Sequence, residues 1–474
     1  MIIPPLILDV ATPELSADEQ ETVNRLQWRM SEAQPALTKR EAYYDGEQPM
    51  RSLGIAIPPE LQDRLRSAAG WPGIVVDTID ERLAIEGFRM GASADSDSEL
   101  WDIWCLNHME RESRLAHLDA LMYGRGFVMV GADDSGMPLI TVESPVSMAA
   151  TYDVSTQRVT AALQAYVFYG DEAAALYLPD ETVHLVRPEG RAWTVRERDR
   201  HGLGRCPVVM LVNRARSRDR YGRSEITAEL MSWTDMACRC LLRMEVAAEF
   251  FSAPQRYILG ASETAFQEAD GTPLDAWETY LGRVLALERD EEGNAPTVGT
   301  FAAADPTPHV SQLTALTKMV AGRTGVPQHL LGFSADNPAS AEGILAAESA
   351  LDRRAKSRQL ALGPEWCEVQ RLVLMLLNGG ALPAEAARLE ALWKPPETPT
   401  PLETSQAIVA QVGAGAIPAT SDVTLSRLGY SAAERARLAA DRQKAASALA
   451  LQQIADSILG PDASAGAGAP AVGG

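Results

Sequence analysis

Residues 224–251 predict one long helix whose apolar side chains occupy more than one face. Apolar residues recur at spacings of four and three from Ile226 to Phe251, and Leu242 and Val246 belong to a second apolar strip. A helix of about 27 residues is roughly 40 Å long, and two apolar strips need apolar neighbours on more than one side. Those neighbours must come from a compact domain or from further copies of the same chain.

This helix is the outward half of a helix–excursion–helix arrangement. Pro254 ends it, and residues 255–308 contain short strand-like pieces and proline-spaced loops. From His309 a second helix returns to about Gly325. The excursion is therefore expected to project from the ends of two paired helices.

The residues before this arrangement change from helical to β-rich. Residues 14–125 are mainly helical, and Ser16 and Glu19 form a capping box. Residues 126–213 consist of short β-rich runs separated by turn residues. The expected helices span 16–32, 59–69, 74–86 and 98–123, and the expected strands span 126–130, 138–143, 159–169, 173–178, 182–186, 192–197 and 207–212. The fold class is therefore α+β and mainly helical, with an antiparallel sheet beside the helices.

The stretch FSADNPASAEGI, residues 333–344, leads into another long helix. Asn337 suits the N-cap, Pro338 suits the first helical position, and Glu342 favours the positive end of the helix dipole. Gly343 fits less well, because a glycine inside a helix costs roughly 1 kcal/mol relative to alanine. The stretch is either an ordinary capped helix start or a hinge between a loop and a helix.

The long helix from Pro338 is expected to bend or break at Gly363-Pro364. Residues 394–402 are rich in proline and form a hinge, and helices are expected at 403–413, 421–428 and 431–458. The last fourteen residues, 461–474, have low complexity and are expected to be disordered.

The charge balance is strongly acidic, with 64 Asp and Glu against 43 Lys and Arg and a net charge of −21. Such a chain is a poor candidate for gripping nucleic acid through phosphate contacts, although it can still enclose nucleic acid. The 5 cysteines are scattered without a CxxC spacing, which favours free thiols in a reducing cytoplasm. No apolar run approaches the roughly 20 residues that span a bilayer, so a soluble intracellular protein without membrane contact is expected.

The sequence lacks the usual catalytic and cofactor signatures. No lysine follows a glycine, so a Walker A loop is absent, and HExxH and GxSxG are absent too. The histidines lack ligand spacing. We therefore expect no catalytic residue, no metal and no cofactor. The alternative from another class is a metal-dependent hydrolase that uses Asp133, Asp134 and Glu143, which lack a supporting His or Lys.

Arginine is concentrated just before the long helix. Residues 187–223 hold 11 Arg and 4 acidic residues, and Arg alternates with other residues through NRARSRDRYGRS. This group is a solvated surface, a subunit interface that faces acidic residues of a neighbouring copy, or a phosphate contact. A second basic group, with the same alternatives, contains Arg353, Arg354, Lys356 and Arg358.

The order of several stretches resembles phage portal proteins of the SPP1-type family, in particular those of actinobacterial phages and prophages. The stretches include EAYYDGEQPM (41–50), VVDTIDERLAIEGF (75–88), YGRGFVMV (123–130), CPVVMLVNRARSRDRYGRSEI (206–226), SAPQRYILG (252–260), TGVPQHLLGFSADNPASAEGILAAESAL (324–351) and WCEVQRLVL (366–374). They extend in order over roughly residues 20–430, so the resemblance covers most of the chain.

The resemblance implies a dodecameric ring at one capsid vertex with double-stranded DNA passing through its centre. It implies these parts: a wing (1–223), a stem helix (224–253), a clip (254–308), a returning stem helix (309–325), a tunnel loop (326–342), a long kinked wing helix (343–393), a crown (394–460) and a disordered tail (461–474). The chain would be part of the virion after assembly in the host cytoplasm. A minor capsid or other connector protein of the virion is the alternative within this class.

The resemblance also implies partners and sites. The partners are the terminase large subunit, a head–tail adaptor, the major capsid protein, the scaffolding protein and further copies of the chain. The tunnel-loop residues expected at the DNA channel are Phe333, Ser334, Asp336, Asn337, Ser340 and Gly343. The residues expected at the subunit interface are Arg214, Arg216, Arg218, Arg220, Arg223 and Trp233.

Overall fold

The computed structural model describes residues 9–49, 68–91, 96–133, 135–251, 256–260, 296–300, 305–332, 341–397, 401–430 and 432–459. The chain divides into two compact units, Met1–Pro396 and Glu397–Gly474. Both helices and antiparallel strands are present in the first unit, so the expected mixed α+β class is confirmed. No helix in the described ranges combines the length and the apolar character needed to cross a bilayer.

Helix α1, Ala17–Tyr44, connects two parts of the first unit. Its start is the predicted capping box, in which the Ser16 side chain accepts from the Glu19 amide and the Glu19 side chain accepts from the Ser16 amide. The helix continues past the predicted end and contains Pro35 in its interior. Its first half packs against the large sheet and its second half against the main core, which explains why it extends beyond the local pattern.

Two antiparallel sheets form the β-rich part. The strands of the larger sheet, in spatial order, are β4 (Met148–Asp153), β5 (Arg158–Phe168), β6 (Asp171–Tyr177), β7 (Thr182–Arg187) and β8 (Thr194–Asp199). The smaller sheet consists of β3 (Pro138–Glu143), β2 (Arg125–Ala132) and β9 (Val208–Val212). Every strand predicted within residues 126–213 is present, but β4 was missed because MAATYD contains few of the β-branched residues that mark a strand.

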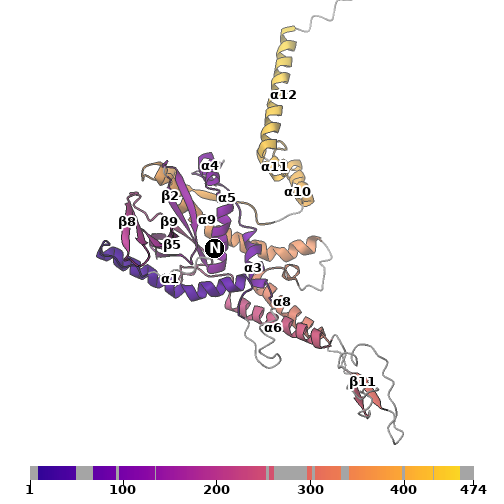
Figure 1. Cartoon of the computed structure of the whole chain (residues 1–474). Helices are drawn as coiled ribbons and strands as arrows, with labels where there is room; N and C mark the ends of the chain where they lie inside the picture. The colour runs from indigo at the N-terminus through magenta and orange to yellow at the C-terminus, as the bar shows by residue number, and fades with distance from the viewer. Residues whose placement is uncertain are drawn as a thin grey trace, which may run out of the picture. The chain divides into compact units, whose positions relative to one another are not determined.

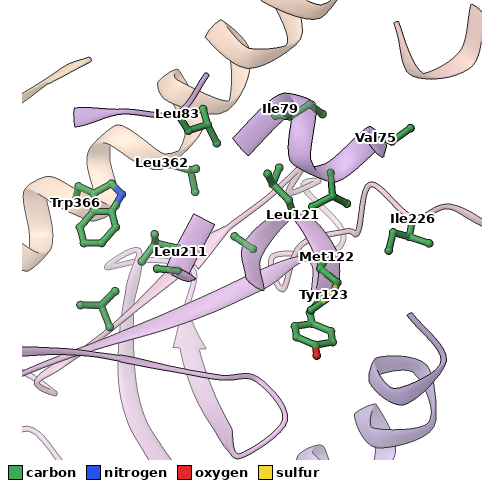
Figure 2. Packing of buried hydrophobic residues seen from close by; sticks show 14 of the residues in the cluster. Val75, Ile79, Leu83, Leu121, Met122, Tyr123, Leu211, Ile226, Leu362 and Trp366 are labelled. Atoms are coloured by element: carbon green, nitrogen blue, oxygen red, sulfur yellow. The ribbon is translucent and has the colours of Figure 1, made fainter. Parts of the chain in front are cut away.

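The main core lies between helices and the smaller sheet. Side chains of α3 (Trp71–Asp80), α5 (Met109–Tyr123), β9 and α9 (Ala341–Leu377) converge there, as Figure 2 shows for Val75, Ile79, Leu121, Leu211 and Trp366. Helix α4 (Ser98–Leu106) adds Trp104, whose ring meets that of Trp366 edge-on at 5.1 Å between centroids. Residues far apart in the sequence therefore form a single core.

Two predicted helices are shorter in the structure than their patterns indicated. The expected helix 74–86 ends at Asp80, because strand β1 (Ile85–Arg89) pairs with β12 (Glu390–Trp393). The expected helix 98–123 is divided into α4 and α5 by His108, whose φ of 53° is incompatible with a continuous helix. Long-range pairing and one left-handed residue overrode the local helical pattern.

The outward and returning helices are α6, Ala228–Phe251, and α8, Thr307–Thr324. They pack side by side (Figure 1). In the excursion, β10 (Arg256–Leu259) pairs with β11 (Thr297–Thr300). The helix–excursion–helix order is confirmed, and residues 261–295 lie outside the described residues.

Helix α9 continues through Pro364, so of the predicted bend or break at Gly363-Pro364, the break is wrong. Leu362 and Trp366 are fully buried on either side of the proline and hold the segment against the core. The long segment expected to end at residue 393 is helical only to Leu377. The short 3-10 helix η3 (Ala384–Arg388) and strand β12 follow it.

The second unit contains α10 (Pro401–Gly413), α11 (Asp422–Arg427) and α12 (Ala432–Leu459). These bounds agree closely with the predicted helices. The Ser421 side chain accepts a hydrogen bond from the Thr424 amide and caps α11. The predicted disordered segment 461–474 lies outside the described residues.

A buried histidine in the main core predicts an acid-sensitive fold. Trp366 Nε1 donates to His117 Nε2 at 2.9 Å, and complete burial lowers the pKa of His117 to about 3. Below an unfolded-state pKa of about 6.5, the unfolded chain binds a proton that the folded chain does not, so stability falls as the pH falls. Between pH 6 and 4, the free energy of unfolding of wild type should fall more steeply than that of His117→Gln. The difference in slope should approach about 1.4 kcal/mol per pH unit.

The measurement is urea unfolding of both proteins across this pH range. Glutamine retains an acceptor for the Trp366 N–H but cannot bind the proton. All other titrating groups are the same in wild type and His117→Gln, so they change the stability of both proteins equally. Parallel pH profiles would show that His117 is solvated or protonated in the folded state.

Candidate functional site

The arginine-rich loop leads from β9 into α6, and its tip is a tight turn. Arg216 and Asp219 exchange two backbone hydrogen bonds, of 2.8 and 3.0 Å. Arg216 and Arg218 are exposed there. The remaining residues predicted at a subunit interface are partly buried, namely Arg214, Arg220, Arg223 and Trp233. The structure therefore separates the predicted arginines into an exposed tip and an inward-facing base.

The base of this loop is attached to the start of β2. The Asn213 amide donates to the Gly124 carbonyl at 3.0 Å, and the Arg223 amide donates to the Asn213 carbonyl at 2.7 Å. Gly222 has a φ of +81°, and a Cβ there would lie 2.0 Å from the Gly124 carbonyl oxygen. Only glycine fits this position, because another residue needs both a strained backbone and the space that Gly124 occupies.

A buried carboxylate lies directly behind the loop. Glu225 is 3% exposed, and its Oε1 accepts from Arg358 Nη2 at 2.7 Å and from Asn213 Nδ2 at 3.1 Å. Its Oε2 lies 3.4 Å from Arg214 Nη1. The Glu225 amide donates to the Leu121 carbonyl at 2.9 Å. Glu225 thus connects the end of α5 through its backbone amide, and the arginine loop and the middle of α9 through its side chain.

Further contacts attach the first half of α9 to the rest of the unit. Arg82 pairs with Glu348 at 3.1 Å and with Asp352 at 3.2 Å, all three side chains being largely buried. Arg354 donates to the Arg323 carbonyl at the end of α8. Burial lowers the pKa of Arg354. In the second basic group, Arg354 and Arg358 therefore make internal contacts, with the end of α8 and with Glu225, whereas Arg353 and Lys356 are exposed.

The predicted tunnel loop begins and ends at anchored backbone. On one side, Trp71 Nε1 donates to the Leu331 carbonyl at 3.2 Å, in the 3-10 helix η2 (Gln328–Leu331). On the other side, Gly343 lies in the first turn of α9, ahead of the Arg82 contacts. The predicted channel residues Phe333, Ser334, Asp336, Asn337 and Ser340 lie outside the described residues.

The carboxylates of the hydrolase alternative are far apart. Asp133 caps the β2–β3 turn by accepting from the Ser135 amide at 2.9 Å and the Met137 amide at 2.8 Å, and hydrogen bonds of this turn lower its pKa. Glu143 is the last residue of β3, opposite Phe127, where burial raises its pKa. A strand of this length separates them by roughly 20 Å, so they do not form one cation site. Asp134 lies outside the described residues.

No cluster of three or more His, Cys, Asp or Glu side chains suited to a metal ion occurs in the part of the chain that the structure describes. What the structure does bring together is the set of contacts around Glu225, which joins the end of α5, the arginine loop and α9 just before α6 begins. Sequence reasoning missed Glu225, because an acidic residue near a helix start normally indicates dipole compensation at the surface.

Comparisons with known proteins agree over most of the chain. Residues 25–447 match the family model described as "Phage portal protein, SPP1 Gp6-like". The portal protein of Mycobacterium phage D29 is 36% identical over 455 residues, which cover 94% of this chain and 91% of that protein. The portal protein of Mycobacterium phage L5 is 37% identical over 432 residues, covering 89% and 88%.

Solved structures with lower similarity include a chain from the "Neck of native GTA particle computed with C12 symmetry". It is 17% identical with a TM-score of 0.41, and the match covers 83% of this chain and 99% of that chain. A chain from the neck of the empty particle, computed with C6 symmetry, is 16% identical with a TM-score of 0.39.

Proposed function

The chain belongs to the phage portal protein family, SPP1 Gp6-like, and from this we propose that it assembles into a dodecameric ring at one capsid vertex. Double-stranded DNA enters the capsid through the centre of this ring during packaging and leaves by the same path. The observation that carries the proposal is the α6–α8 pair, with the paired strands β10 and β11 between the two helices in sequence and with α9 following the return. The match over residues 25–447 favours this function over a minor capsid or other connector protein.

The parts of the ring follow from the order of the elements. We assign residues 1–223 to the wing, 224–253 and 309–325 to the stem, 254–308 to the clip and 326–342 to the tunnel loop. Residues 343–393 return to the wing, and 394–460 form the crown. The clip contacts the terminase large subunit during packaging and the head–tail adaptor afterwards, while outer surfaces contact the major capsid and scaffolding proteins.

The composition of the tunnel loop suits sliding DNA. The stretch FSADNPAS carries one acid and no base. Phosphate contacts by Lys or Arg would hold the DNA at fixed points, so a weakly interacting lining permits movement. The matched family is structural, and we assign no catalytic residue, metal or cofactor to this chain. The energy for packaging is supplied by terminase, and the protein remains in the virion after assembly in the host cytoplasm.

Electron microscopy of the purified protein tests the ring directly. Rings with a central hole are expected, and averaged end views give the number of subunits. Compact monomers under all solution conditions would overturn the proposal.

Gly343 provides a test of the tunnel loop. Gly343→Ala is expected to stabilise the first turn of α9 by roughly 1 kcal/mol. The residues of this turn would then unwind into the loop less readily. Packaging of DNA into procapsids should fall severalfold, while ring assembly is unchanged. The measurement is DNase-protected DNA per procapsid.

Gly363→Ala is the matched control, because Gly363 lies in the interior of the same helix and a Cβ there meets Trp393 Nε1 at an ordinary 3.4 Å. Because Gly363 precedes Pro364, this alanine is not expected to raise helix stability; it changes the same helix away from the loop, so packaging should be unaffected. Normal packaging by Gly343→Ala would remove the role assigned to this glycine.

A further inference from the structure

A groove between α1 and the arginine loop is lined by three arginines from different elements. Arg29 and Arg40 come from α1, and Arg125 opens β2. The groove has a volume of about 450 Å³. Trp28, Tyr123 and Tyr221 also line it, so the charges lie among aromatic rings.

The three arginines have backbone carbonyl partners instead of carboxylates. Arg40 Nη1 donates to the Tyr123 carbonyl at 2.6 Å, Arg29 to the Ala150 carbonyl at 3.4 Å, and Arg125 to the Tyr221 carbonyl at 3.5 Å. None of the three belongs to an ion pair found among the described residues. Positive charge has therefore accumulated in a partly enclosed space without direct neutralisation.

Burial makes this arrangement costly. It lowers the pKa of Arg40, and burial followed by repulsion from Arg40 lowers the pKa of Arg125. Two carboxylates of the chain, Glu32 and Asp219, also line the groove, and Asp219 partly offsets the repulsion at Arg125. A guanidinium held out of water is stabilised by an anion that accepts its N–H groups, and within the described part of the chain neither Glu32 nor Asp219 forms an ion pair with any of the three arginines.

The aromatic residues favour carboxylates of a protein partner over the phosphates of DNA as the anion. Trp28 is 62% exposed, and the Arg29 guanidinium lies over the Tyr221 ring, 4.6 Å from its centroid. Trp, Tyr and Arg are the residues that dominate the binding energy of protein–protein interfaces. The surrounding chain has a net charge of −21, which disfavours the approach of a polyanion such as DNA.

We propose that this groove receives carboxylate side chains from an adjacent copy of the chain, and that it is a subunit contact of the ring. The inference rests on the proposed ring function. A neighbouring copy has acidic side chains in excess, because 64 acidic residues face 43 basic ones in each chain. In a closed ring the contact is heterologous, so each copy offers its groove to one neighbour and its carboxylates to the other.

The test compares assembly of charge variants. Arg29→Glu places a carboxylate in the groove, and Arg40→Gln removes a charge but retains an N–H donor for the Tyr123 carbonyl. Arg25→Glu is the matched control, because Arg25 is an exposed residue of the same helix outside the groove. Mass photometry measures the ring fraction against protein concentration, and circular dichroism confirms that each variant is folded.

Arg29→Glu should raise the concentration of half-assembly at least tenfold, Arg40→Gln severalfold, and Arg25→Glu less than twofold. Because the complementary face of Arg29→Glu is intact, this variant should also lower the ring yield of wild-type protein when the two are mixed. Rings formed by folded Arg29→Glu at wild-type concentrations would overturn the inference while leaving the ring function in place. Absence of wild-type rings would overturn both.

Fluorescence anisotropy of a 30-base-pair DNA duplex tests whether the groove binds DNA phosphates instead of carboxylates of an adjacent copy. Equal binding by wild type and Arg29→Glu is expected. Loss of duplex binding in a variant that still forms normal rings would assign the groove to phosphate and overturn the inference.

Discussion

Replacing Glu225 with alanine is expected to lower the free energy of unfolding by about 3–5 kcal/mol. The substitution removes the acceptor shared by Arg358, Arg214 and Asn213. The side chain of Arg358 is 11% exposed, so its charge would remain largely buried without its partner. An unpaired buried charge is among the most destabilising changes that a single substitution can cause.

Urea unfolding at one fixed protein concentration measures this effect, since ring formation would add a concentration-dependent term. Glu225→Gln should lose less stability, because the amide still accepts hydrogen bonds, although it does not neutralise Arg358. Glu245→Ala is the matched control on α6, where Glu245 is exposed, and it should change stability by less than about 0.5 kcal/mol. A loss below about 1 kcal/mol for Glu225→Ala would show that water replaces the carboxylate.

Gly222→Ala is expected to be the most damaging single methyl group that can be added to the arginine loop. The new Cβ would lie 2.0 Å from the Gly124 carbonyl oxygen, 2.8 Å from the Asn213 carbonyl oxygen and 2.9 Å from Val212 Cγ1. The first two atoms belong to backbone, so relief requires the loop to move away from β2. We expect a loss of more than about 4 kcal/mol or failure to accumulate as soluble protein.

Gly190→Ala separates the cost of a left-handed backbone conformation from the cost of the steric clash at Gly222. Gly190 has a φ of +71°, close to that of Gly222, but no atom lies within 4 Å of its hypothetical Cβ. It should therefore lose only the roughly 1–2 kcal/mol that a left-handed conformation costs an L-residue. Similar unfolding midpoints for the two variants would show that the loop yields readily and that Gly222 is needed only for its backbone conformation.

The helices in the second half of the chain were predicted closely because their signals are local. Periodic apolar residues, a capping serine at Ser421 and proline-rich boundaries suffice to mark α10, α11 and α12. Helix α9 shows where this reasoning stops. Pro364 predicts a bend or a break locally, but Leu362 and Trp366 are fully buried against the core, and the helix is not broken.

The candidate sites show the same limit. The arginine-rich loop was recognised from composition, but composition did not separate the exposed Arg216 and Arg218 from the inward-facing Arg214. The groove with Arg29, Arg40 and Arg125 was missed altogether, because its lining comes from α1, β2 and the arginine loop. No sequence window contains enough of these residues to suggest a site.

The order of the elements, the acidic balance and the resemblance to portal proteins follow from residues in sequence order, and all three could be predicted. Which charges are neutralised could not be predicted, because it depends on the packing of distant segments. Arg358 meets Glu225 across 133 residues, and Arg82 meets Glu348 across 266. Whether a charged side chain is paired, buried or available depends on what surrounds it in space, and that is set by packing of distant segments, which local periodicity does not encode.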